Sequence, residues 1–137
     1  MKKHVILTVV FVLIAALMVG CGSSKYKDGT YKAESEPDER GNNAYVEITI
    51  KDGKIADVVW KELSNGVEKD ENYGKVNGVI ENEENYQKAQ NALKASKSYA
   101  EKLVEVQDIN KVDAVSGATH SHELFVKLVK EALNKAK

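Results

Sequence analysis

Residues 113–122, DAVSGATHSH, hold most of the side chains in this sequence whose types and spacing could do chemistry. The stretch combines one acid with three hydroxyl groups and two imidazoles, and Gly117 and Ala118 keep its middle small. Apolar residues at steps of three and four follow it, so we expect it to lie at the start of a helix. These residue types fit a helix cap, a metal site, a hydrolase site or an anion site.

The simplest interpretation is an ordinary helix start. Gly117 would form the turn, and Thr119 or Ser121 would cap the helix. A side-chain oxygen in that place accepts a hydrogen bond from a free backbone amide. The pattern alone does not decide between such a cap and a functional site.

A metal site would use His120 and His122, with Asp113 or Glu123 as further ligands. Side chains two residues apart on a helix point about 200° away from each other, so the two imidazoles would converge only on an extended segment. A serine hydrolase would need a G-x-S-x-G elbow, which the sequence lacks. Between residue 5 and this stretch there is also no histidine to complete a triad. Both kinds of site are therefore disfavoured.

An anion site would use the hydroxyl groups and the helix together. A helix start offers unpaired N–H groups and a partial positive charge, which together suit a phosphate. Gly117 and Ala118 would let a ligand approach the backbone closely. The hydroxyl of Thr119 would then be placed to bind a phosphate or to be esterified by one.

Alternating apolar and polar residues predict the strands that must position this stretch. Residues 45–50 alternate, and residues 55–61 form the return strand of a hairpin. The turn between them is Asp52-Gly53, because both residues tolerate positive φ. A weaker strand is expected at residues 30–34. Asp57 falls among apolar neighbours, so the pattern leaves the register of the hairpin open.

Helical periodicity takes over in the second half of the chain. Apolar residues at steps of three and four predict a helix over residues 83–106, with Asn82 as its N-cap, and a second amphipathic helix over residues 124–133. Residues 64–81 are expected to form a loop, with a short strand near residues 79–80. The sequence thus predicts an α+β fold, in which a small antiparallel sheet with a hairpin packs against two main amphipathic helices.

The first 20 residues indicate an export signal. Lys2 and Lys3 precede an apolar run over residues 5–20, which is too short and too abruptly ended for a comfortable membrane-spanning helix. Without these two lysines the 20 basic residues fall to 18 against 21 acidic ones, so the mature part has a net charge of −3. This balance argues against nucleic acid as a partner and against a polybasic membrane contact.

Residues 17–21, LMVGC, resemble the lipobox of bacterial lipoproteins, with Met18 where leucine is usual. The resemblance implies that Cys21, the only cysteine, is lipidated and becomes the mature N-terminus. Acyl chains, palmitate among them, would anchor the protein to the bacterial cell membrane on its extracytoplasmic face. We therefore expect a lipidated cysteine and short tether at residues 21–27 and one domain at residues 28–137. An ordinary signal peptide with an unpaired cysteine is the alternative.

Residues 113–119, DAVSGAT, resemble the D-x-x-[S/T]-G-A-[T/S] motif of the FMN-binding domain family at all five specified positions of the seven. The segments YKDGTYKAE, VEITIKDGKIADVVW and SHELFVKLVKEAL are similar to the family as well, so the resemblance covers most of residues 26–133. In that family a flavin transferase moves FMN from FAD onto the last hydroxyl residue of the motif and forms a phosphoester.

The resemblance implies that FMN is attached covalently to Thr119. The residues around this acceptor would bind the cofactor, and they are Asp113, Ser116, Gly117, Ala118, His120 and Ser121. Asp113 would orient the motif or help to hold the metal that the transferase uses. His120 stands where many family members have a small hydroxyl residue, and it would shield, crowd or hydrogen-bond the phosphate.

These implications lead to the hypothesis of an extracytoplasmic electron-transfer flavoprotein, a redox carrier more than a turnover enzyme. FMN would do the redox chemistry, and the partners would be a flavin transferase and redox proteins of the membrane or the cell exterior. Trp60 or a tyrosine would stack on the flavin ring or, more ordinarily, lie in the core. Two alternatives stay open: a non-redox surface lipoprotein that acts as a binding or signalling module, and noncovalent binding of a phosphorylated ligand at the same helix start.

Overall fold

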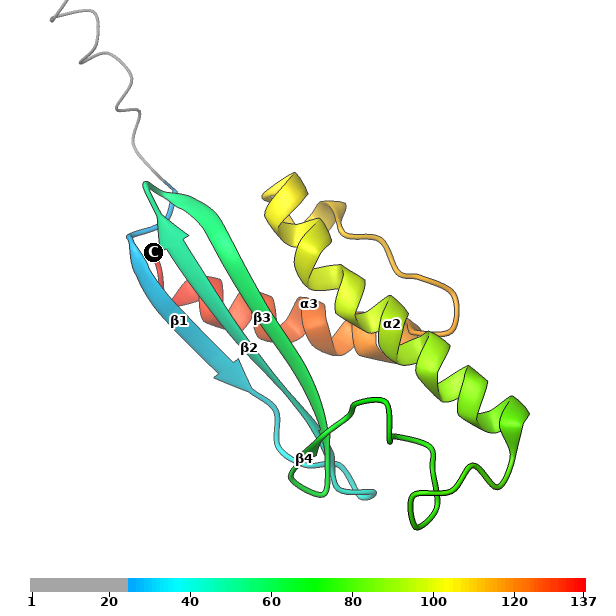
Figure 1. Cartoon of the computed structure of the whole chain (residues 1–137). Coiled ribbons are helices and arrows are strands. Elements are labelled where there is room, and N and C mark those ends of the chain that lie inside the picture. Colours follow the sequence, from blue (N-terminus) through cyan, green and yellow to red (C-terminus); the bar gives the residue numbers. More distant parts are fainter. Residues whose placement is uncertain (1–24) are drawn as a thin grey trace, which may run out of the picture.

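The structure is a computed structural model that describes residues 25–137. The expected signal segment and Cys21 lie outside the described residues. Figure 1 shows a sheet with two long helices on one side of it. The predicted α+β fold is therefore confirmed. No helix in the described part of the chain is long and apolar enough to cross a membrane.

The sheet is an antiparallel meander in which each strand pairs with the next along the chain. Its strands are β1 (Gly29–Glu34), β2 (Asn42–Lys51), β3 (Lys54–Ser64) and β4 (Val67–Glu68). The predicted hairpin turn joins β2 to β3, with φ values of 53° at Asp52 and 73° at Gly53. Positive φ at both turn residues matches the twist of the flanking strands, which is why this dipeptide is favoured there.

A bulge in the hairpin explains the awkward position of Asp57. The register shifts at Thr49/Ile50, so that Thr49 pairs with Asp57 and Ile50 pairs with Ile55. Ala56 is left without a partner, and one extra residue of this kind changes which face the following side chains occupy. Ile55 and Val58 are consequently both buried while Asp57 is exposed.

The first long helix, α2 (Glu83–Val106), begins and ends as predicted. The side chain of Asn82 accepts a hydrogen bond from the Asn85 amide at 2.9 Å, so the predicted N-cap is confirmed. The helix ends at Gln107, whose backbone is left-handed with φ 61°. The Gln107 side-chain amide then bonds both backbone groups of Ile55, at 2.9 and 2.8 Å, and ties the end of the helix to the bulge.

The second long helix, α3 (Thr119–Asn134), starts within the DAVSGATHSH stretch and follows a short 3-10 turn, η2 (Ile109–Lys111). It packs on β1 and β2, while α2 packs mainly on β3.

The segment between β3 and α2 differs from the prediction, because the strand expected at residues 79–80 is wrong. The chain instead forms β4, and Val76 and Val79 make a single isolated bridge.

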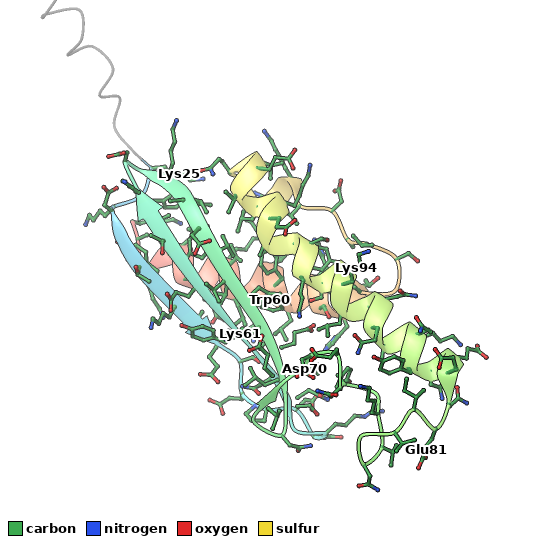
Figure 2. All side chains as sticks on the ribbon, viewed as in Figure 1. Lys25, Trp60, Lys61, Asp70, Glu81 and Lys94 are labelled. Carbon is green, nitrogen blue, oxygen red and sulfur yellow. The ribbon has the colours of Figure 1, made fainter. Side chains whose placement is uncertain are left out.

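The core lies between the sheet and the two helices. Its largest fully buried side chains include Tyr99, Phe125, Ile48, Leu103 and Leu128. Trp60 belongs to β3 and lies on the part of the strand that α2 crosses (Figure 2), with its ring edge-on to Phe125 at 5.1 Å. The Trp60 indole N–H donates to the hydroxyl of Ser96, which is fully buried, at 2.8 Å. Trp60 thus belongs to the core, as its more ordinary interpretation predicts.

Candidate functional site

The candidate site is the connection from η2 into α3, drawn in orange beside α2 in Figure 1. Residues 115–118 form a tight turn, in which the Ala118 amide donates to the Val115 carbonyl at 3.0 Å. Gly117 has φ 88°, a conformation that glycine adopts without strain. A Cβ at Gly117 would meet no atom within 4 Å. The backbone conformation therefore favours glycine here, and the outer side of the turn is open.

A buried tyrosine from α2 supports the inner side of this turn. The Tyr99 hydroxyl donates to the Ala118 carbonyl at 3.0 Å and accepts from the Val115 amide at 2.9 Å. Only 1% of Tyr99 is exposed. One hydroxyl thus joins both ends of the turn from beneath, and the turn has a fixed place relative to α2.

The two histidines have different surroundings. His122 is half-buried, and its Nε2 lies 2.5 Å from the Val112 carbonyl. Because a carbonyl only accepts, Nε2 carries the proton in this contact. The His122 ring also packs edge-on against Tyr99, with centroids 5.2 Å apart. His120, in contrast, is exposed. Within residues 25–137, no three His, Cys, Asp or Glu side chains come together as a metal site.

The start of α3 has no side-chain cap. The N-cap residue is Ala118, so the interpretation of Thr119 or Ser121 as a capping residue is wrong. Ser121 instead donates its hydroxyl to Glu62 of β3 at 2.7 Å, which ties the helix start to the sheet. Among the described residues, the amides of Thr119, His120 and Ser121 have no hydrogen-bond acceptor.

This geometry suits an anionic group at the surface. Thr119 is exposed at the first position of α3, next to free amides and the positive end of the helix dipole. A hollow of about 340 Å³ lies between α2 and the residues that precede Thr119, with Asp113 and Val115 among its lining. Thr119 does not line it, and its charged side chains are mostly acidic, since Glu101, Glu105 and Asp113 face a single lysine. The helix start therefore combines an exposed hydroxyl with free N–H donors, and these groups, not the acidic hollow, suit an anionic group.

Comparison with known proteins identifies the family of this chain. Residues 40–134 match the model of the FMN-binding domain, which is more than half of the chain. The chain belongs to the FMN-binding domain family. It is similar to the 15 kDa lipoprotein of Treponema pallidum (strain Nichols), with 29% identity over 132 residues that cover 93% of this chain and 89% of that one. The crystal structure of CPE2226 from Clostridium perfringens is 25% identical, with a TM-score of 0.65 over 81% of this chain and 88% of that chain.

The site residues fit the phosphate of FMN. Three backbone amides without acceptors can donate to phosphate oxygens. Gly117 leaves the approach to the backbone open, and Ser116 is exposed beside it in the turn. Ala118 contributes differently, because its methyl group is buried and its carbonyl is bonded by Tyr99. Asp113 and His120 are both exposed.

The sequence did not predict that three side chains support the site, namely those of Tyr99, His122 and Glu62. Tyr99 lies on the apolar stripe of α2, and like the other tyrosines it was expected in the core or against the flavin ring, not as a support of the turn. The available signal was its chemistry, because a buried tyrosine hydroxyl needs a hydrogen-bond partner that phenylalanine would not need. The partner could not be identified, because Val115 and Ala118 lie 16 and 19 residues away along the chain.

Proposed function

We propose that this FMN-binding domain protein is a membrane-anchored electron-transfer flavoprotein of the extracytoplasmic face, with FMN phosphoester-linked to Thr119. The observation that carries the proposal is the exposed Thr119 hydroxyl at an uncapped helix start, as the last residue of DAVSGAT. Membership of the FMN-binding domain family supplies the cofactor. When bound, FMN supplies the capacity to accept and donate electrons, while the protein supplies attachment and environment.

Attachment of FMN would be a substitution at phosphorus. Thr119 Oγ1 forms a bond to the FMN phosphorus of FAD, the phosphoanhydride bond to AMP breaks, AMP leaves, and the hydroxyl proton is lost to solvent. A flavin transferase is the partner that catalyses this step. The amides of Thr119, His120 and Ser121 would donate to the phosphoester oxygens. The helix dipole would add about 0.3–1 kcal/mol for an exposed group.

The membrane anchor is proposed on separate grounds. The segment that ends in Cys21 resembles a lipobox, and the similar protein of Treponema pallidum is a lipoprotein by name. Lipidation of Cys21 would hold the domain at the outer surface of the bacterial membrane, within reach of redox partners there. A covalent cofactor suits this location, because a released flavin would diffuse away from the cell.

The proposal is tested by coexpression with an exported flavin transferase, followed by denaturing electrophoresis and flavin fluorescence. The native protein should retain fluorescence after denaturation. Thr119→Ser keeps a hydroxyl at the same position and should also be labelled, whereas Thr119→Ala should be folded but unlabelled. Labelling of Thr119→Ala would show another attachment site. A native protein without flavin would favour a non-redox module, and flavin lost on denaturation would favour noncovalent binding.

A further inference from the structure

The Tyr99 hydroxyl makes two hydrogen bonds that close the turn before Thr119 from opposite ends. It accepts from the Val115 amide and donates to the Ala118 carbonyl, at 2.9 and 3.0 Å. The turn has one further bond of its own, from the Ala118 amide to the Val115 carbonyl. Two of these three bonds therefore depend on one side chain from a different helix.

The surroundings of Tyr99 make this support rigid. Its ring stacks on Phe125 at 5.8 Å and meets the edge of His122 at 5.2 Å. His122 reaches back to the Val112 carbonyl, which lies just before the motif. His122 thus holds the chain just before the motif, at Val112, and Tyr99 holds it within the motif, at the two ends of the turn, while the tip of the turn is exposed.

We propose that Tyr99 is a positioning residue for the modification of Thr119. Its hydroxyl keeps the turn in the one conformation in which a flavin transferase can bind the acceptor. Without that hydroxyl, the turn samples other conformations. The apparent affinity of the transferase then falls in proportion to the fraction of molecules whose turn is in the binding conformation. This inference rests on the proposed function, in which Thr119 is the acceptor.

Tyr99→Phe is the discriminating variant, because it keeps the buried ring and removes both hydrogen bonds. Tyr86→Phe is the matched control on the same helix, since the Tyr86 hydroxyl donates to the Glu71 carbonyl at 2.8 Å, away from the motif. Ser96→Ala is a second control that weakens the core without touching the turn. Each protein is incubated with FAD and a purified exported flavin transferase at a temperature where circular dichroism shows it fully folded.

For Tyr99→Phe we expect the KM of the transferase for the acceptor protein to rise about tenfold, equivalent to about 1.4 kcal/mol, with kcat within twofold of the native value. Tyr86→Phe and Ser96→Ala should match the native protein. Hydrogen exchange gives a readout without flavin: the Val115 amide should lose protection in Tyr99→Phe alone. An unchanged KM for Tyr99→Phe, or an equal rise in Ser96→Ala, would overturn the positioning role. Failure of the native protein to be modified would instead overturn the proposed function.

Discussion

The buried bond between Trp60 and Ser96 offers a sharp test of how α2 is fixed to the sheet. The indole N–H of Trp60 donates to Ser96 Oγ at 2.8 Å, and Ser96 has no exposed surface. Ser96→Ala removes only the hydroxyl oxygen, so packing is almost unchanged. The indole N–H is then buried without an acceptor.

The expected loss follows from two opposing contributions. Leaving a buried donor unsatisfied costs about 1–3 kcal/mol. Alanine has a better helix propensity than serine by up to about 0.7 kcal/mol, which offsets part of that cost. We therefore expect Ser96→Ala to lower the free energy of unfolding by about 1–2 kcal/mol.

Ser98→Ala is the matched control, because Ser98 is exposed on the same helix and bonds only the Ala95 carbonyl one turn away. It gains the same propensity without leaving a buried donor. Urea unfolding is followed by the fluorescence of Trp60, the only tryptophan, and by circular dichroism. If Ser96→Ala is as stable as Ser98→Ala, the bond does not fix α2 to the sheet and the reasoning is refuted.

Three further predictions concern the turns that frame the domain. Backbone bonds from the Gly53 and Asp52 amides lower the pKa of Asp28 below 3.8. The stability that these bonds contribute is therefore present above pH 3.8, the ordinary pKa of the carboxyl group. It is lost as the pH falls through the lower pKa that Asp28 has in the folded protein. In an NMR pH titration, the chemical shift of the Gly53 amide should change with a midpoint at the pKa of Asp28. In Asp28→Asn this change should be absent. Gly117→Ala should cost about 1–2 kcal/mol in urea unfolding, because φ 88° strains any residue with a Cβ; no loss would contradict the turn geometry. Gln107→Ala should cost about 1–2 kcal/mol through the bonds to Ile55. Gln107→Gly should lose less, since glycine relieves the left-handed backbone, and equal losses would argue against this account.

The sequence was sufficient where local chemistry decides the structure. Alternation and the Asp52-Gly53 turn predicted the hairpin, and helical periodicity with Asn82 predicted α2 at both ends. The bulge was not predictable, because the apolar pattern does not say whether Ala56 or a neighbour loses its partner. The strand expected at residues 79–80 was wrong, because those apolar residues are exposed rather than paired in the sheet.

The candidate site was likewise predictable only where local chemistry decides its structure. Small residues and hydroxyl groups predicted a helix start in this stretch, and α3 does begin at Thr119. The role of Thr119 as the acceptor is implied by the resemblance to the FMN-binding domain family and stays a prediction. The support beneath the helix start depends on contacts between distant segments, such as Tyr99 with Ala118 and Ser121 with Glu62. Such contacts leave no periodic pattern in the sequence, and so only the folded chain reveals them.

The most direct test of the account is the intact mass of the mature protein from its own host. The account predicts a chain that begins at lipidated Cys21 and carries the mass of one FMN less one water, with that increment on the peptide containing Thr119. Thr119→Ala from the same host should keep the lipid and lose only the flavin. A native protein without the flavin increment, from cells in which an exported flavin transferase is active, would contradict the central claim.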